Sequence, residues 1–398
     1  MTERLNEQEK RWAVISLASI PLIMTLGNSM LIPILPVMEQ ELGISKLQSS
    51  YIITAYSVVA IFLIPVAGFL SDRFGRKKVI IPSLIITGVG GLIAGLASQL
   101  MDNPFLIIVA ARILQGIGSS GAFPIVLPLV GDIFKDDKEA STTLGIVETS
   151  NTVGKVLSPI LGAALAAIIW FVPFYSIPLF CAVSVLLVIF LIKNNGEENE
   201  THFKEYMDSA KDAFKKHGRW LVAVFFIGAI LMFVLFGFLF YLSSILEEKY
   251  DYEGVWKGIL LAVPLLALSI ASFITGRKIK DNLTVMKWVT FTGIVFTGVS
   301  VAVIPFMDHP VYLLTIFFIC GTGIGMALPC LDAMITESLE KDVRGVITSI
   351  YSAMRFTGVA AGPPIIAVLM KSNITWMASV LAIFALIASF LGYRYIKP

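Results

Sequence analysis

Long runs of residues with almost no charge are the feature that most constrains how this chain folds. The hydrocarbon core of a bilayer is about 30 Å thick, so a helix needs about 20 apolar residues to cross it. These runs lack the alternation of a strand, and a backbone inside lipid must satisfy its own hydrogen bonds, so we predict a membrane helix for each. There are twelve, at residues 12–38, 47–70, 78–99, 104–131, 140–166, 168–192, 219–246, 252–276, 284–306, 311–338, 344–370 and 373–396.

The composition agrees with an all-α integral membrane protein. Hydrophobic residues make up 57% of the chain and charged residues 15%, whereas about a quarter of an average soluble chain is charged. The first apolar run is too long for the core of a signal peptide and has no small-residue cleavage site, so we read it as the first membrane helix.

The distribution of Lys and Arg predicts the orientation. With the N-terminus in the cytoplasm, 23 of the 30 basic residues fall in cytoplasmic segments and 4 in external ones, among them Lys46 and Lys257. Short cytoplasmic loops of membrane proteins are enriched in Lys and Arg. We therefore expect a multi-pass protein of the cell (inner, cytoplasmic) membrane with both termini cytoplasmic.

A polar stretch halfway along the chain divides it into two bundles. We predict an N-terminal six-helix bundle at 1–192, a cytoplasmic linker at 193–218 and a C-terminal six-helix bundle at 219–398. The second part of the linker is either a plain solvated segment or an interfacial helix. In the second case it would lie on the anionic inner leaflet through one apolar face, formed by Phe203, Met207, Ala210 and Phe214.

The two halves contain matching small-residue patterns. Gly116, Gly118, Ala122 and Pro124 recur 205 positions later as Gly321, Gly323, Ala327 and Pro329. Gly154 and Pro159 recur 204 positions later as Gly358 and Pro363. Two matches on either side of a central linker indicate duplication, with both six-helix repeats in the same (parallel) orientation.

The loop after the second predicted helix contains an acid that a simple basic anchor does not explain. It reads Gly-Phe-Leu-Ser-Asp-Arg-Phe-Gly-Arg-Lys-Lys from Gly68, with Asp72 among the basic residues. A positive-inside anchor accounts for Arg76 and the two lysines after it, but not for Asp72. A neighbouring Arg and a nearby helix N-terminus would stabilise this carboxylate.

This loop matches G-x-x-x-D-R-x-G-R-[KR]-[KR], and with it the chain resembles the major facilitator superfamily, in particular its 12-helix drug:proton antiporters. In that family the motif is a conformational latch that holds the outward-open state. The resemblance implies that Asp72 meets the start of the eleventh helix, near Arg344, and a charge at the end of the fourth. The latch residues are then Gly68, Asp72, Arg73, Gly75, Arg76 and Asp132.

The fourth predicted helix carries a cation roughly 12 Å deep in the membrane, counted at 1.5 Å per residue. Such a residue usually faces a cavity or a partner, and a structural hydrogen bond between helices is the simpler interpretation. Arg112 and Gln115 lie in Arg-Ile-Leu-Gln-Gly, which resembles the R-x-x-Q-G motif of proton-coupled members. There the Arg assists proton transfer.

The fifth predicted helix resembles the antiporter motif G-x-x-x-G-P-x-x-G-G, in which small residues permit tight helix crossings and Pro bends the helix. Ser158 and Ala163 replace two glycines, and Lys155 places a charge within the motif. These departures weaken the inference of drug export. The helix-packing residues are Gly154, Ser158, Pro159 and Gly162.

Other polar residues within spans are candidates for the proton or substrate site. Glu148 precedes Lys155 by two helical turns, so both point the same way but lie too far apart to pair directly. Asp332, Arg355 and Asn28 complete the candidates, with burial as ordinary helix-contact residues as the alternative. The first and seventh helices have no acid in their cores, so by elimination Glu148 is the predicted proton carrier.

These features predict a proton-coupled secondary transporter that works by alternating access and exports small amphipathic compounds, as multidrug efflux proteins do. A lipid or glycolipid translocase, or another facilitator of small molecules, is one alternative, and a non-transporting receptor or scaffold is another. We expect no enzyme activity, metal or cofactor, since no nucleophile–base set, ligand cluster or nucleotide-binding loop is present. The expected partners are a small-molecule substrate, the coupling protons and the bilayer, with no nucleic acid, for a monomer.

Overall fold

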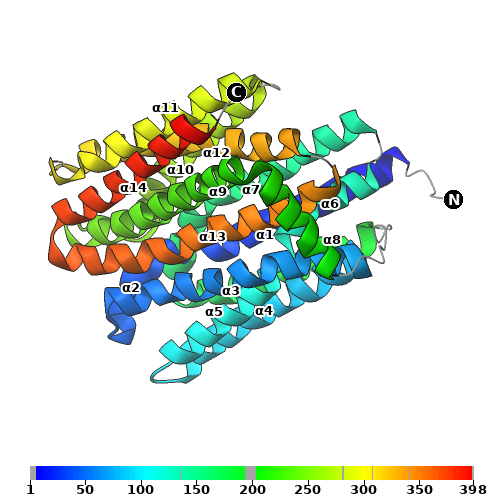
Figure 1. The fold of residues 1–398 in the computed structure, drawn as a ribbon. Coiled ribbons are helices and arrows are strands. Elements are labelled where there is room, and N and C mark those ends of the chain that lie inside the picture. Colours follow the sequence, from blue (N-terminus) through cyan, green and yellow to red (C-terminus); the bar gives the residue numbers. More distant parts are fainter. Residues whose placement is uncertain are drawn as a thin grey trace.

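The computed structural model describes residues 6–134, 136–192, 203–279, 282–306, 308–339 and 341–396, which form one bundle of roughly aligned helices (Figure 1). By length and hydropathy, this part of the chain contains eleven candidate membrane spans. The helices are α1 (Glu7–Ser29), η1 (Ile32–Ile34), α2 (Leu35–Leu42), α3 (Lys46–Phe74), α4 (Arg76–Leu100), α5 (Phe105–Ser120), α6 (Phe123–Ile133), α7 (Asp137–Ala166), α8 (Val172–Leu191), α9 (Phe203–Glu248), α10 (Gly254–Lys278), α11 (Leu283–Ala302), η2 (Ile304–Phe306), α12 (Pro310–Ser338), α13 (Lys341–Ser372) and α14 (Ile374–Tyr395).

The helix α7 accounts for the difference between the twelve predicted spans and the eleven apolar ones. It has 30 residues, which is long enough to cross a bilayer. It packs against α1 on one side and α10 on the other. Its polar residues, which include Glu148, Asn151 and Lys155, lower its hydropathy below that of the other spans.

Local sequence signals explain several helix ends. Asn6 and Ser45 each form a capping box at the start of α1 and α3, with Glu9 and Gln48 as the reciprocal partners. Between α3 and α4 the chain turns at Gly75, whose φ of 95° suits glycine. This single residue lets the chain reverse directly from one membrane helix into the next.

The small-residue repeat marks equivalent helix crossings in the two halves. A Cβ on Gly116 would meet the backbone of Tyr56 in α3, and one on Gly321 would meet the backbone of Pro264 in α10. Two residues further along, Gly118 faces α4 and Gly323 faces α11 in the same way. Glycine is required at these positions because two helix backbones touch there.

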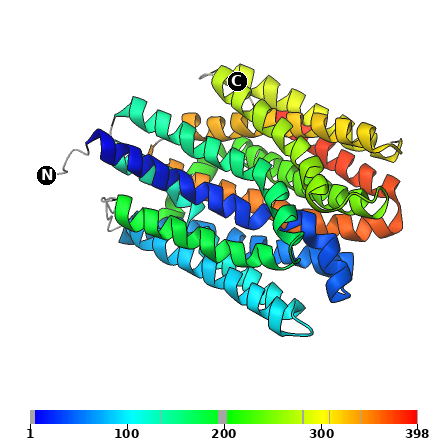
Figure 2. The same cartoon turned by 180° about the vertical axis from the view of Figure 1, so that it is seen from behind.

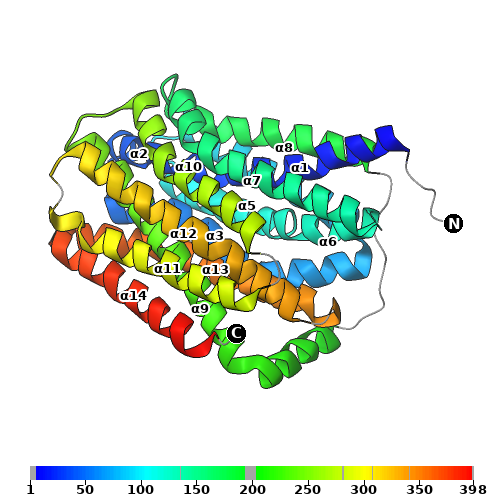
Figure 3. The same ribbon diagram turned by 90° about the horizontal axis from the view of Figure 1, so that it is seen from above.

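The described part of the linker packs against the helical bundle. From residue 203 it is helical and continuous with α9, and its first turns bend away from the rest of that helix (Figure 3). Ala210 and Ala213 are 2% and 6% exposed, and the ring of Phe214 meets that of Phe225 edge-on at 5.5 Å. Ala210 and Phe214 of the predicted apolar face therefore pack on the protein itself, while residues 193–202 and the side chain of Phe203 lie outside the described part.

The two halves meet mainly along two pairs of helices, α3 with α13 and α7 with α10. Within the N-terminal half, α1 lies between α7 and α8 (Figure 2). The segment from Gly68 to Arg76, which comprises the last turns of α3 and the start of α4, lies at one end of the bundle, which we call the latch end. The end that carries α2 and the last turn of α9 is called the opposite end.

Candidate functional site

Four ionisable side chains from both halves form a central cluster. Glu148 and Lys155 come from α7, Asp332 from α12 and Arg355 from α13. Arg355 Nη1 donates a hydrogen bond to Asp332 Oδ1 at 3.3 Å. Lys155 interacts electrostatically with Glu148, Asp332 and Arg355. The cluster therefore joins the N-terminal half to the C-terminal half through charge.

Parts of this cluster are accessible to solvent, although all four residues belong to helices of membrane-spanning length. The side chain of Asp332 is 49% exposed and that of Arg355 is 25% exposed, and Glu148 is also exposed. Charges in membrane helices usually face a bundle interior or a water-filled cavity. The mutual electrostatic interactions of these side chains place the accessible surface between the two halves rather than on the outside of the bundle.

A hydrogen bond from the next turn of α7 orients Glu148, and α1 supports it through a second bond. Asn151 Nδ2 donates to Glu148 Oε1 at 3.2 Å. The other amide atom, Asn151 Oδ1, accepts from Thr25 Oγ1 of α1 at 2.7 Å. Neither Thr25 nor Asn151 stood out in the sequence, since a polar residue in an amphipathic stretch gives no sign of its partner.

Arg112 forms a second and separate group. Its side chain is 0% exposed and donates three hydrogen bonds: Nε to the carbonyl oxygen of Ile52 at 2.9 Å, Nη1 to Gln115 Oε1 at 2.5 Å and Nη2 to Asn28 Oδ1 at 2.8 Å. The guanidinium carbon also lies 4.5 Å from the ring centre of Tyr56. The structure thus brings together three of the predicted residues, Asn28, Arg112 and Gln115.

The two groups do not meet. Within the part of the chain that the structure describes, Lys155 interacts with the other three members of the central cluster and Arg112 with Tyr56. The seven predicted cavity residues therefore divide into an accessible cluster of four and a buried cluster of three.

The loop motif forms a compact ion-pair network at the latch end. Arg76 pairs with Asp72 on the preceding helix, its Nε lies 3.1 Å from Asp132 Oδ2 of α6, and its Nη1 donates to Ser71 Oγ at 2.7 Å. Arg73 lies over the ring of Phe74, its guanidinium carbon 5.4 Å from the ring centre. Arg76, rather than Asp72, is thus the centre of the network.

The segment with the predicted latch residues contacts α13 at Gly68. A Cβ on this glycine would lie 3.0 Å from Ser349 Oγ and 3.1 Å from the hydroxyl of Tyr206. Among the described residues, no ion pair joins Asp72 to Arg344, whose Nη2 instead donates to the carbonyl oxygen of Leu339 at 3.2 Å. Burial raises the pKa of Tyr206, which precedes the spanning part of α9, to about 12, so its hydroxyl stays neutral.

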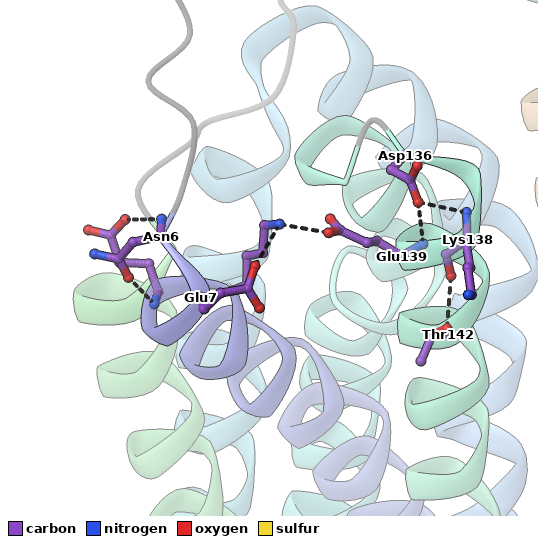
Figure 4. Close-up of polar contacts among 8 residues, drawn as sticks. Asn6, Glu7, Asp136, Lys138, Glu139 and Thr142 are labelled. Atoms are coloured by element: carbon purple, nitrogen blue, oxygen red, sulfur yellow. Dashed lines mark hydrogen bonds and ion pairs between the residues drawn. The ribbon is translucent and has the colours of Figure 1, made fainter.

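A second ion pair at the latch end joins α1 to α7. Lys10 Nζ lies 2.6 Å from a carboxylate oxygen of Glu139 and 3.2 Å from one of Glu7 (Figure 4). Asp136 caps α7 beside it by accepting hydrogen bonds from the backbone N–H groups of Lys138 and Glu139. The first turn of α7 is therefore tied to α1.

The small residues of α7 allow close packing on two neighbours. A Cβ on Gly154 would lie 3.2 Å from the carbonyl oxygen of Leu22, and one on Gly162 would meet the backbone of Met30. The hydroxyl of Ser158 donates a hydrogen bond to the carbonyl oxygen of Gly154 at 2.8 Å. The carbonyl oxygen of Pro159 faces Gly258 of α10, so this segment is also the contact between the halves.

Charged residues that the sequence placed in external loops link the halves at the opposite end. Lys257 was counted there, but it lies inside α10, 2% exposed, with its Nζ 2.5 Å from Glu247 Oε2. Gln40 Nε2 of α2 donates to the other oxygen of Glu247 at 3.4 Å, and Lys46 Nζ lies 2.6 Å from Glu248 Oε2. Loop lengths and charge counts contain no sign of the partners of Gln40 and Lys46, because these lie 207 and 202 positions away.

A bundle of membrane-length helices with charged residues between two repeated halves is the architecture of a secondary transporter. The chain belongs to the Major Facilitator Superfamily: the sequence model of that family matches residues 17–363 and 286–398. It is 54% identical over 379 residues to the bacillibactin exporter of Bacillus subtilis (strain 168), covering 94% of each chain. It is 25% identical over 381 residues to multidrug resistance protein 2 of the same organism, covering 94% of this chain and 92% of that one.

Solved structures share the fold. The human organic anion transporter TETRAN superimposes with a TM-score of 0.75 at 16% identity, over 96% of this chain and 99% of that one. A bacterial homologue of the human lysosomal transporter Spinster, in an inward-facing and occupied conformation, gives a TM-score of 0.76 at 14% identity, over 98% and 97% of the two chains. At these identities the likeness establishes the fold alone.

Proposed function

We propose that this protein is a proton-coupled exporter that moves a small amphipathic compound across the cell membrane by alternating access. The observation that supports this most is the central cluster, because it places Glu148 and Lys155 of one half opposite Asp332 and Arg355 of the other. Two halves that rock about such a site would change which side of the membrane the site faces.

The central cluster has the chemistry that proton exchange requires. Glu148 is an accessible acid held by Asn151, and Asp332 is a second acid held by Arg355. Protonation of either carboxylate would weaken its electrostatic interaction with the nearby cations, so the charge between the halves would depend on proton occupancy. A substrate that competes with protons there would be exchanged for them.

The relatives support export and suggest the first substrates to test. The bacillibactin exporter shares 54% identity over almost the whole chain, so we propose bacillibactin as the first candidate. Multidrug resistance protein 2 is a more distant relative, so a multidrug-type amphipathic compound is the second. Both proposals assign the substrate to the central cluster.

The contacts at the opposite end support an inward-facing state of this transporter. Lys46–Glu248 and Gln40–Glu247 join the halves there, and Gly258 packs against Pro159. Glu148 and Asp332 nevertheless remain accessible. With the termini in the cytoplasm, the site would load from inside and release its substrate after these contacts open.

The test is counterflow in proteoliposomes with an imposed pH gradient. Bacillibactin export should accelerate with a proton gradient directed opposite to the substrate movement, and Glu148→Gln should lower this gradient-driven rate at least tenfold. Glu253→Gln is the matched control, because Glu253 is exposed at the start of α10 and has no side-chain capping bond. Parent-like gradient dependence in Glu148→Gln would falsify the proposed carrier role.

A further inference from the structure

Arg112 is a buried cation without a carboxylate partner. Its side chain is 0% exposed, and its three hydrogen-bond acceptors, a backbone carbonyl and the oxygens of Gln115 and Asn28, are all neutral. Within the described part of the chain, no carboxylate makes an ion pair with it. A buried charge is costly unless an opposite charge compensates for it.

Another deeply buried cation of the described residues is compensated. Lys257 is 2% exposed, and the carboxylate of Glu247, itself 7% exposed by side chain, lies 2.5 Å away. At Arg112 the equivalent role falls to Asn28, an amide of the same shape as an aspartate but without its charge. Among the described residues, Arg112 is stabilised by neutral groups, its three acceptor oxygens and the ring of Tyr56, so a bound anion would supply the opposite charge.

A small pocket beside Arg112 has room and donors for such a group. Thr87, Tyr56 and Gly27 line it together with Arg112 and Gln115. The space left in it is about that of one water molecule. Gln115 is 0% exposed, and its Nε2, a hydrogen-bond donor, has no partner. An unpartnered buried donor next to an uncompensated cation is a combination that favours an anion.

We propose that this pocket binds a small halide ion such as chloride, which neutralises Arg112 and accepts a hydrogen bond from Gln115. The size of the pocket excludes polyatomic anions such as acetate and phosphate. This site is separate from the central cluster, so the proposal stands apart from the proposed proton exchange at Glu148.

The experiment measures the thermal unfolding of the purified full chain while sodium gluconate is replaced by sodium chloride, bromide or acetate at constant ionic strength. A ligand that binds the folded state alone raises its melting temperature. We expect the parent to gain about 2 °C or more. A response to chloride or bromide supports the site, whereas acetate is too large for the pocket and should behave as gluconate does. A response confined to acetate would contradict the proposal.

Two variants locate the site by supplying the missing charge from within. Asn28→Asp and Gln115→Glu each place a carboxylate against Arg112, so both should be stable without added anion and should lose the anion response. Two variants are used so that the test survives if one fails to fold. Arg277→Gln, which removes an exposed cation stacked on Phe273, controls for general salt effects and should keep the parent response.

The proposal is overturned if no small anion stabilises the parent over gluconate. It is equally overturned if Asn28→Asp and Gln115→Glu, once folded, respond to the anion as strongly as the parent does, because binding would then lie elsewhere.

Discussion

At the scale of single residues, the buried charges show how strongly stability depends on partners. Lys257 and Glu247 lie together at the opposite end, and Gln40 of the other half reaches the same carboxylate. Removing one member of a buried ion pair leaves the other unpaired, which typically costs more than removing both. The pair therefore contributes to the specificity of how the halves close as well as to stability.

We expect Lys257→Met to destabilise the protein by about 3–5 kcal/mol, because it leaves Glu247 buried without a counter-charge. The double variant Lys257→Met with Glu247→Gln should recover much of that loss. Thermal unfolding in detergent measures both. The exposed pair Lys249–Asp308 at the same end is the control, since Lys249→Met should change the melting temperature little. A single variant as stable as the parent contradicts the argument.

At the scale of helices, α7 combines packing and charge. Its first half presents Glu148 and Asn151, while its second half presents small residues to α1 and α10. Close packing there holds the helix against both neighbours, so the charged side chains keep their positions between the halves. This contact explains why Ser158 can replace a glycine of the antiporter motif. Its side chain is small, and its hydroxyl donates a hydrogen bond to the carbonyl oxygen of Gly154 within the same helix.

Two glycines of α7 provide a matched test of this packing. Gly162→Ala should destabilise the protein by about 1–3 kcal/mol, because the new Cβ meets the backbone of Met30. Gly145→Ala has nothing within 4 Å of its Cβ and should be neutral or stabilising, because alanine favours a helix over glycine. Melting temperatures of the two variants, compared side by side, decide the point. Equal effects would show that α7 does not rely on the close crossing.

At the scale of the whole molecule, the arrangement of the two halves depends on a few contacts at each end. The latch end has Gly68 against Ser349, and the opposite end has the ion pair of Lys46 with Glu248. Lys46 and Glu248 belong to different halves and are partly exposed. Their pairing therefore contributes modestly to stability but biases which side of the transporter is closed.

Reversing the charge at Lys46 should shift the halves toward opening at the opposite end, because Lys46→Glu faces the like charge of Glu248. A cysteine placed at Ser243, which is 1% exposed and bonds to the carbonyl oxygen of Ile32 in the other half, should then react several-fold faster with a membrane-impermeant maleimide. The native cysteines Cys181, Cys320 and Cys330 are buried, so the background should be low. Lys46→Glu combined with Glu248→Lys should restore the parent rate, and a swap that stays open would contradict this role for the pair.

The sequence alone determined the helical class, the repeat and the family. Hydropathy and helix length are properties of contiguous residues, so the spans could be located without knowing how they pack. The same holds for Gly116 and Gly321, since a duplicated crossing leaves the same small residue in both halves. The second part of the linker stayed open between a solvated segment and an interfacial helix, because an apolar face does not reveal whether lipid or protein covers it.

The tertiary structure decided which polar residues meet. Arg112 and Asn28 are 84 positions apart, and Lys46 and Glu248 are 202 apart. No local pattern encodes such partners, which are chosen by how the helices rotate and cross. For the same reason Lys257 looked like a loop charge and proved to be buried. Helices form from local spacing, whereas the pairing of charges between them depends on three-dimensional packing.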